Sequence, residues 1–339
     1  MKVTTFGLDL AKRVFQLHWV DVETGEIGRR QLKRAQVLEW FANRAPAVIA
    51  MEACGSAHYW ARKLTGLGHE VRLIGAQFVR PFVKSNKTDA ADAQAIWEAV
   101  QRPGMKFVAV KSEAQQSVLM MHRMREQLVK MRTMQINQLR GLLYEFGVEL
   151  PQGRANGVAR IPAELVKLDG VLPAMVVETI RGQLQRIAAL DQDIGQIEKK
   201  LKLWKKDDAA SKKLMDIPGV GLLTATAAVA TIGDAKAFKS GREFAAFVGL
   251  VPRQSGTGGR VKLLGISKRG DVYLRTLLIH GARAVITHGK EREPWLEQLL
   301  ARRPLNAVVV ALANKMARTI WALLAHERTY QKGYVARVA

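Results

Sequence analysis

Two acidic residues stand in stretches that otherwise have the pattern of buried β-strands. Asp9 lies in Thr5-Phe6-Gly7-Leu8-Asp9-Leu10, and Glu52 ends the run Val48-Ile49-Ala50-Met51-Glu52. A carboxylate that is buried without a partner or a metal ion costs a large amount of free energy. The fold must therefore supply Asp9 and Glu52 with other polar groups or with a cation.

A third acidic stretch, Asn86-Lys87-Thr88-Asp89-Ala90-Ala91-Asp92-Ala93, opens a helical pattern. Asp89 and Asp92 are three residues apart, which puts their carboxylates on one face with Cβ atoms roughly 5–6 Å apart. Acids in a first helical turn also interact favourably with the helix dipole, so the pair can be a simple cap. The presence of Asp9 and Glu52 upstream favours a shared carboxylate site instead.

Residues 1–108 are expected to form an α/β domain. The strand patterns cover Val3–Leu8, Phe15–Val20, Ile27–Leu32, Ala47–Met51 and Val71–Ile74. Helical patterns cover Ala35–Asn43, Tyr59–Leu67 and Asp89–Val100. A strand hairpin followed by alternating helices and strands predicts a mixed sheet that is covered by helices.

The charge of the chain indicates a polyanionic partner. Lys and Arg number 53 against 30 acidic residues in a chain of 339, which gives a net charge of +23. An excess of this size favours nucleic acid, with an anionic membrane surface as the second choice. We expect no membrane span, because no run approaches the ~18 apolar residues that a span needs. The single cysteine, Cys54, excludes an intrachain disulfide and a multi-cysteine zinc site. With no signal-peptide pattern at the start, these features predict a cytoplasmic protein.

Residues 109–206 are expected to be helical. Apolar residues recur at helical spacing in two runs, which the Gly- and Pro-containing segment Pro151–Pro173 separates by breaking the helices. Two such helices predict a coiled-coil arm. Basic residues beside the first run either face solvent or contact a nucleic-acid backbone. The first run comprises Met121, Met124, Leu128 and Met131, and the second comprises Ile180, Leu184, Ile187, Leu190, Ile194, Ile197, Leu201 and Trp204.

Residues 207–339 are expected to form a third domain, following a charged linker at Lys199–Lys213. Its first motif, Asp216-Ile217-Pro218-Gly219-Val220-Gly221-Leu222, resembles a helix-hairpin-helix. In that motif Gly219 and Gly221 would let backbone N–H groups approach a phosphate at the start of the next helix. A Pro-Gly loop before an apolar helix is the simpler alternative.

A second basic segment of this domain extends from Gly249 to Gly270 and contains six glycines. Its composition predicts a flexible loop whose backbone approaches phosphates and whose basic side chains neutralise them. Ser255 lies in this loop, but a Ser-Gly pair in a loop is usually only a turn, so spacing alone does not make it a nucleophile. The basic side chains of the loop are Arg253, Arg260, Lys262, Lys268 and Arg269.

The order of the acids resembles that of a known fold family. Acids on a first strand, a later strand and a following helix are typical of the RNase H-like fold in the RuvC-like variant of Holliday-junction resolvases. More specifically, Phe6-Gly7-Leu8-Asp9-Leu10-Ala11-Lys12, Met51-Glu52-Ala53-Cys54-Gly55 and the stretch Asn86 to Ala93 resemble the three DEDD blocks of Piv/MooV-type insertion-sequence transposases, a family of bridge-RNA-guided recombinases. The resemblance implies a catalytic, metal-binding tetrad of Asp9, Glu52, Asp89 and Asp92. Lys12 and Lys87 lie in these blocks and are candidate nucleic-acid contacts.

The C-terminal part resembles the same family. The stretches from Leu250 to Gly256 and from Gly265 to Gly270, followed by Leu274-Arg275, are similar to the signature of the family's transposase domain. The resemblance assigns the nucleophile to Ser255. Many relatives have two adjacent serines there, whereas this chain has Gln254-Ser255, and Ser267 is the second candidate. Arg275 joins the basic residues of the loop as a candidate nucleic-acid contact.

The resemblance covers nearly the whole chain and implies a recombinase. Four converging carboxylates need cations, and oxygen ligands suit Mg²⁺ or Mn²⁺, here two ions that clamp a phosphate. Ser255 would bond covalently to DNA and conserve the bond energy for rejoining. A structured guide RNA would pair with donor and target DNA, and the arm would let the subunits of a dimer or tetramer share one site.

Two other functions are compatible with the residues. A metal-dependent nuclease of the Holliday-junction type would hydrolyse DNA with the four acids and would not need Ser255. A non-enzymatic nucleic-acid-binding scaffold would need the basic charge and the helix-hairpin-helix, but it gives the four acids no role.

Overall fold

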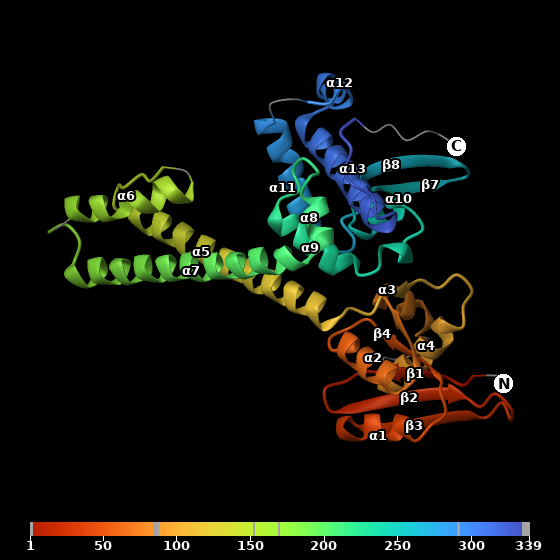
Figure 1. Cartoon of the computed structure of the whole chain (residues 1–339). Coiled ribbons are helices and arrows are strands. Elements are labelled where there is room, and N and C mark those ends of the chain that lie inside the picture. The colour runs from red at the N-terminus through yellow and green to blue at the C-terminus, as the bar shows by residue number, and fades with distance from the viewer. Residues whose placement is uncertain (1–2, 84–87, 152, 169, 290–291, 334–339) are drawn as a thin grey trace. The chain divides into compact units, whose positions relative to one another are not determined.

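The structure is a computed structural model that describes residues 3–83, 88–151, 153–168, 170–289 and 292–333. The chain divides into two compact units (Figure 1). The first comprises Met1–Gln115 and Ile232–Lys239, and the second comprises Gln116–Thr231 and Ser240–Ala339. The first unit is therefore built from two pieces of chain that are far apart in the sequence.

A six-stranded sheet forms the centre of the first unit, in the order β3-β2-β1-β4-β5-β6. The pairs β1–β4 and β4–β5 are parallel, and the other pairs are antiparallel. The mixed sheet expected from the sequence is thus confirmed. The sequence did not predict the last strand, whose two residues are too few to form a pattern. The strands are β1 Thr5–Asp9, β2 Val14–Val20, β3 Ile27–Lys33, β4 Val48–Glu52, β5 Glu70–Ile74 and β6 Phe107–Val108.

Helices cover both faces of this sheet. On one face α1 (Val37–Ala42) and α2 (Ala57–Gly66) share the main core with residues such as Leu8 and Phe15. On the other face α3 (Ala76–Val79) and α4 (Asp89–Val100) share a smaller core. Because successive side chains of a strand point to opposite faces, β1 directs Phe6 and Leu8 to the main core and Gly7 and Asp9 to the face of α4. The sheet thereby presents Asp9 to the helix that carries the other two aspartates.

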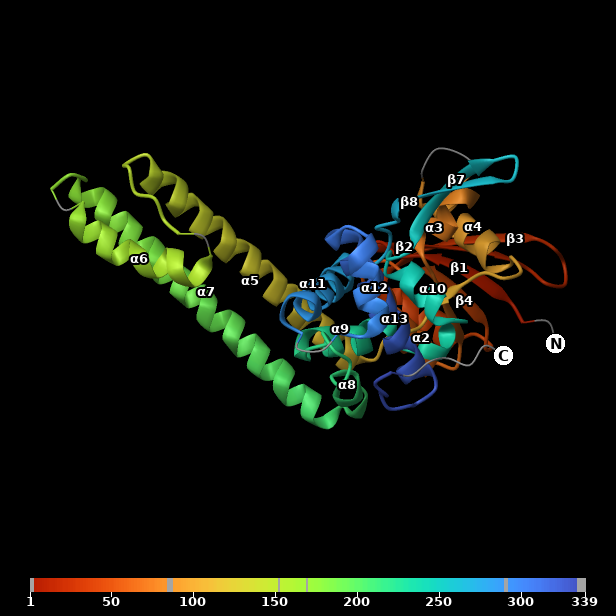
Figure 2. The ribbon, with the colours of Figure 1, turned by 90° about the horizontal axis from the view of Figure 1, so that it is seen from above.

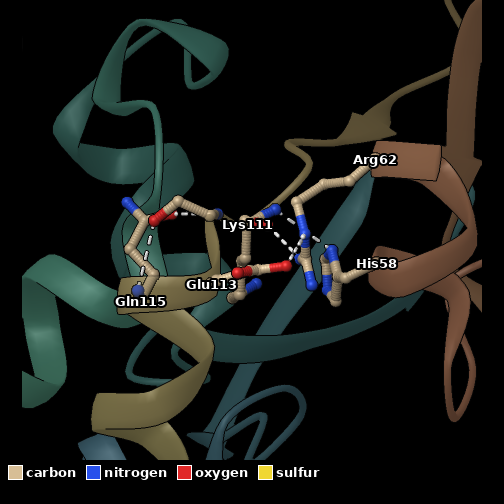
Figure 3. Close-up of polar contacts among 6 residues, drawn as sticks. His58, Arg62, Lys111, Glu113 and Gln115 are labelled. Atoms are coloured by element: carbon tan, nitrogen blue, oxygen red, sulfur yellow. Dashed lines mark hydrogen bonds and ion pairs between the residues drawn. The ribbon is translucent and has the colours of Figure 1, made fainter. Parts of the chain in front are cut away.

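A polar contact with α2 holds the residues at which the chain leaves this sheet (Figure 3). Arg62 Nη1 donates a hydrogen bond of 2.6 Å to the carbonyl oxygen of Lys111, and His58 Nδ1 accepts one of 3.2 Å from the Lys111 backbone N–H. Arg62 Nε also lies 3.9 Å from Glu113 Oε1. Burial, together with the charges of Lys111 and Arg62, lowers the pKa of His58 to about 4, so its ring is neutral and free to accept. The contact fixes the start of α5 (Glu113–Tyr144).

Two long helices, α5 and α7 (Ala174–Asp207), lie side by side, with α6 (Arg154–Lys167) packed at their far end (Figures 1 and 2). The predicted apolar face of α7 is buried at Ile180, Ile187, Leu190, Ile194, Ile197 and Leu201. The coiled-coil character of the pair stays a prediction.

The predicted apolar face of α5 is only partly right. Met121 and Leu128 are half-buried and pack against a core that includes Ile197 and Leu201. The side chains of Met124 and Met131 are 53% and 41% exposed, and the buried residues are instead Val118, His122, Ile136, Leu139 and Leu143. Between these buried residues, two arginines of α5 form ion pairs with α7. Arg125 pairs with Glu198 at 2.7 Å, and Arg132 pairs with Asp191 at 2.5 Å. The apolar pattern locates the packed face of α5 only in part, because ion pairs occupy positions on that face.

Two segments expected to interrupt the helices are themselves helical. The segment Pro151–Pro173 contains α6, and Pro162 lies inside that helix. The charged stretch Lys199–Lys213 is not a linker: it contains the end of α7 and most of α8 (Ala209–Leu214). Asp208 caps α8, since its Oδ2 accepts a 2.6 Å hydrogen bond from Ser211 N–H. Lysine is a good helix former, so a run of lysines does not end a helix.

The remaining part of the second unit is mostly helical. The residue that connects it to α5 is His122, which is 1% exposed. The Thr226 hydroxyl donates to Leu222 O at 2.8 Å and accepts from His122 Nε2 at 2.9 Å, and the Tyr273 hydroxyl donates to His122 Nδ1 at 2.9 Å. The helices of this part are α9 Leu222–Ile232, α10 Gly241–Phe247, α11 Val272–His288, α12 Pro294–Arg302 and α13 Leu305–Ala325.

Helix α13 is long and apolar enough to cross a membrane by length and composition. Asn314, Lys315 and Arg318 interrupt its apolar residues, so the expectation of no membrane span stays a prediction. In this unit α13 packs against α10, α11 and α12 and buries residues that include Val308, Ala313, Ala317 and Ile320. This is the packing expected of a core helix.

Candidate functional site

Asp9 and Glu52 end two neighbouring parallel strands. Asp9 is the last residue of β1 and Glu52 is the last residue of β4, one position beyond the register pair Leu8–Met51. Both side chains are half-buried. Because the strands run in the same direction, their carboxyl ends bring the two acids to the same edge of the sheet.

The first turn of α4 supplies the other two acids. Thr88 is the N-cap of this helix, and its hydroxyl oxygen accepts a hydrogen bond of 3.2 Å from Ala91 N–H. The capping position is thus occupied by Thr88, and the side chains of Asp89 and Asp92 are available for another purpose. Carboxylate oxygens of Asp9, Asp89 and Asp92 all lie within 4.8 Å of one another.

The proximity of these acids changes the protonation of Asp9. Burial and the negative charges of Asp92, Asp89 and Glu52, in that order, raise the pKa of Asp9 from 3.8 to about 6. Glu52 lies outside the 4.8 Å group but is near enough to repel Asp9. The four acids therefore form one electrostatic cluster, and a divalent cation bound by their oxygens would relieve the repulsion.

Gly7 explains how α4 comes so close to Asp9. A Cβ atom on Gly7 would collide with the carbonyl oxygen of Ala93 and lie 2.8 Å from the Trp97 Cβ. The Trp97 Nε1–H also donates a hydrogen bond of 3.1 Å to Thr5 O. Sequence reasoning singled out the acids but missed Gly7, although a glycine inside a strand signals a close approach of backbone.

Of the two lysines predicted to contact nucleic acid here, Lys12 is exposed three residues after Asp9. Lys87 lies outside the described residues. Cys54, two residues after Glu52, is an exposed free thiol.

The second predicted site, the serine segment, is a β-hairpin rather than a flexible loop. β7 (Pro252–Thr257) pairs with β8 (Arg260–Ile266), and Ser255 is the register partner of Lys262. The two-residue turn holds Gly258 and Gly259, both with positive φ angles. All of β7 is exposed, and so are Arg260, Lys262, Lys268 and Arg269. Turn-forming glycines organise this hairpin, and a reading of them as flexibility alone was wrong.

The base of the hairpin is held by Arg275, which is 7% exposed. Its Nη1 donates hydrogen bonds of 2.8 Å to Val248 O and 2.9 Å to Arg269 O. Its guanidinium therefore organises the protein backbone. Ser267 lies at the same base, half-buried, and its hydroxyl oxygen accepts a 3.4 Å hydrogen bond from Arg269 N–H. Ser255 and Ser267 thus have different surroundings, since only Ser255 lies on the exposed strand.

The turn predicted as a helix-hairpin-helix connects α8 to α9. Gly219 has a φ angle of +83°, and a Cβ atom there would lie 2.7 Å from Gly281 O of α11. The turn therefore needs this glycine to pack against α11. Gly221 is exposed, with open space around its α-carbon.

The sequence was compared with those of known proteins and families. Residues 6–147 match the IS110-type DEDD transposase model, and residues 211–297 match the model described as the transposase IS116/IS110/IS902 family. A probable family 20 transposase of Pseudomonas aeruginosa is 50% identical over 98% of this chain and 100% of its own length. The chain belongs to the IS110/IS116 family of insertion-sequence transposases.

Two further members are similar over nearly the whole chain. The transposase for insertion sequence element IS1111A of Coxiella burnetii is 42% identical over 98% of this chain and 92% of its own length. The transposase for IS1328 of Yersinia enterocolitica is 40% identical over 97% of this chain and 99% of its own length. The resemblance to insertion-sequence transposases is thereby confirmed, and the acidic cluster lies within the segment that matches the DEDD transposase model.

Proposed function

We propose that this transposase cuts and rejoins DNA at a divalent-metal site formed by Asp9, Glu52, Asp89 and Asp92. The observation that carries this function is the group of three aspartates with carboxylate oxygens within 4.8 Å of one another. The donors are all oxygens, which suits Mg²⁺ or Mn²⁺. When bound, two such ions would polarise the scissile phosphate and stabilise the charge on the attacking and leaving oxygens.

We further propose Ser255 as the nucleophile. Its Oγ forms a bond to phosphorus as the bond between phosphorus and the departing strand oxygen breaks. The hydroxyl proton passes to solvent, and the departing oxygen takes up a proton. Attack by the hydroxyl of another strand end then reverses these steps and frees the serine, so no phosphodiester is lost to water. The exposure of Ser255 and the lysine opposite it, Lys262, support the role, because the ammonium group would attract the phosphate.

Partners follow from the charge and from the family. A structured guide RNA would pair with donor and target DNA, and the protein would hold the backbones of both with exposed cations such as Arg253, Arg260, Lys262, Lys268 and Arg269. The turn that resembles a helix-hairpin-helix is a further candidate for contact with nucleic acid, because Gly221 is exposed. For Arg275 we propose a positioning role in place of a nucleic-acid contact, because its donors bind Val248 O and Arg269 O.

Self-association is the remaining part of the proposal. Met120, Met124, Met131 and Met134 are exposed along α5, which gives the arm an apolar surface for a second subunit. A dimer or tetramer formed through the arms would let the acids of one subunit act with the serine of another.

A covalent adduct tests this function. The protein, with the RNA that co-purifies with it, is incubated with Mg²⁺ and labelled DNA from the ends of the element, and then resolved on a denaturing gel. We expect an adduct that resists boiling, is absent from Ser255→Ala and is retained by the matched control Ser267→Ala. Asp9→Ala should abolish the adduct and leave DNA binding intact.

Free DNA ends without an adduct, unchanged in Ser255→Ala, would instead indicate the junction nuclease. DNA binding without cleavage in any variant would indicate the scaffold.

A further inference from the structure

Strand β3 forms one edge of the sheet in the first unit (Figure 1). Its exposed side chains include Arg29, Gln31 and Lys33, which can bind phosphate and stand at alternate positions of the strand. Residues at alternate positions of a strand share one face, so these three side chains lie in a row on one side of β3.

The register of the sheet shows which side this is. Asp9 on β1 is opposite Gln16 on β2, and Gln16 is opposite Gln31 on β3. Directly opposed residues on paired antiparallel strands project to the same face. The row on β3 therefore lies on the face that carries Asp9. With strands about 4.8 Å apart, the Cα of Gln31 lies about 10 Å from that of Asp9.

The surroundings of His18 support the same orientation for Arg29. His18 is opposite both Gly7 and Arg29, and its ring packs against Trp97 of α4 at a centroid distance of 5.5 Å. Burial and the charge of Arg29 lower the pKa of His18, whereas Glu98 of α4 raises it. Arg29 therefore lies on the side of the sheet that α4 occupies.

Helix α4 packs on β1 and β2, and the row on β3 beside it is open to solvent. Within the described part of the chain, neither Arg29 nor Lys33 belongs to an ion pair. The two cations and the amide therefore lie on the same face as the acidic cluster, farther toward the edge of the sheet, and the cations have no acidic partners among the described residues.

We infer that Arg29, Gln31 and Lys33 bind the sugar–phosphate backbone of the DNA strand whose scissile phosphate lies at Asp9. This inference rests on the proposed function. A strand that crosses β2 and β3 on this face would bring phosphates next to the scissile one over the row. The two cations neutralise phosphate charge and the amide donates to phosphate oxygens, and neither contact selects a sequence.

The alternative is that these side chains only protect a sheet edge. Charged residues on edge strands keep two molecules from pairing edge to edge, and they need no ligand for that purpose. Arg30 separates the two interpretations. It is exposed and adjacent to Arg29, but its register partner Leu17 belongs to the main core, so Arg30 lies on the opposite face.

The test compares Arg29→Gln and Lys33→Gln with the matched control Arg30→Gln, which removes the same charge from the same strand. Binding of a labelled single-stranded DNA is measured in EDTA over a range of salt concentrations. Each variant of the row should lower the slope of log affinity against log salt by about 0.7 and weaken binding about fivefold at 0.1 M salt. Arg30→Gln should leave both unchanged. Equal effects of all three variants, or no effect of any, would overturn the inference, and so would an asymmetry seen only with single-stranded RNA.

A local measurement is needed as well, because a chain of charge +23 binds DNA at many places. In a Cys54→Ser background, Gln31→Cys and Arg30→Cys are each mixed with DNA that carries a disulfide-forming tether on one phosphate. Only the Gln31→Cys protein should crosslink efficiently, and equal crosslinking would contradict the inference. Both experiments are independent of Ser255 and of metal. If the Ser255 adduct forms but the row variants and Arg30→Gln behave alike, only this inference is contradicted. If the row variants differ from Arg30→Gln but no adduct forms, only the proposed function is contradicted.

Discussion

Gly7 lies against the carbonyl oxygen of Ala93, so that helix α4 rests directly on the backbone of β1. There is no room for a side chain between them, since a Cβ on Gly7 would lie 2.8 Å from the backbone nitrogen and the Cβ of Trp97 as well. The same contact brings the first turn of α4, with Asp89 and Asp92, beside Asp9. The geometry of the acidic cluster thus depends on a residue without functional groups.

We expect Gly7→Ala to push α4 away from β1. Overpacking of this kind should lower the free energy of unfolding by about 1–3 kcal/mol, measured by urea denaturation. It should also reduce the thermal stabilisation that we expect from Mg²⁺ binding at the proposed site. Gly66→Ala is the matched control, because a Cβ there meets no atom within 4 Å. Its free energy of unfolding should not fall, since alanine is the better helix former, and its Mg²⁺ stabilisation should be unchanged. Normal Mg²⁺ stabilisation of Gly7→Ala would show that the cluster tolerates a displaced α4.

Binding of Mg²⁺ should depend on the ionisation of Asp9. Its pKa in the folded protein is about 6 against an ordinary 3.8, so between these values the folded chain binds more protons than the unfolded chain. The metal-free protein therefore loses stability as pH rises through this window. Above pH 6 the ionised cluster attracts cations, so Mg²⁺ should raise the melting temperature more at pH 8 than at pH 5. Asp9→Asn should remove most of this difference, and equal stabilisation of the unaltered chain at both pH values would contradict the prediction.

His122 should make the second unit sensitive to acid. Burial and the charge of Arg125 lower its pKa from 6.5 to about 4. Between these values the unfolded chain binds more protons, so stability falls as pH drops from 6.5 towards 4, by up to about 3 kcal/mol. His122→Gln can donate to Thr226 and accept from Tyr273, and it should flatten the pH dependence of urea unfolding. His58 also has a pKa near 4. If the pH dependence of unfolding disappeared only in His58→Gln, His58 would be its cause and the prediction for His122 would be contradicted.

The Arg132–Asp191 ion pair between α5 and α7 can be tested by removing one partner and by replacing both. Asp191→Ala leaves the mostly buried Arg132 without its partner at 2.5 Å and should cost about 1 kcal/mol. Replacement of both residues by leucine completes the apolar heptad and should restore at least the original stability. The measurement is thermal unfolding of the full chain. A double variant as unstable as Asp191→Ala would mean that the polar pair specifies the packing of these helices.

The first unit could be predicted from sequence because its signals are local. Short apolar or alternating runs between turns located all five strands of ordinary length, and the acids at the ends of the first and fourth strands stand out against that pattern. The helix that begins at Asp89 follows from its cap and composition. The proximity of Asp9 to Asp92 could not be read from the same signals, because it depends on the long-range fit of Gly7 against α4.

The second unit was harder for a physical reason. Arg125 and Arg132 hide the face by which α5 packs, since ion pairs there replace the apolar residues that reveal a period. Gly258 and Gly259 suggest freedom, although their positive φ angles form a tight turn between β7 and β8. The buried position of Arg275 also has no local signature, because its partners are backbone carbonyls that any sequence supplies.

Because the first unit consists of two pieces of chain, its parts are synthesised at different times. Residues 232–239 belong to the unit that residues 1–115 begin, and the whole helical arm is encoded between them. At ribosomal speeds of about 5–20 residues per second, roughly 6 to 23 s separate the synthesis of the two pieces. All six strands of the sheet and its acids are therefore synthesised first, and the unit lacks residues 232–239 until the arm has been made. A nascent chain released early would carry the acidic cluster without the serine hairpin, so only a full-length chain carries both sets of residues that the proposed chemistry needs.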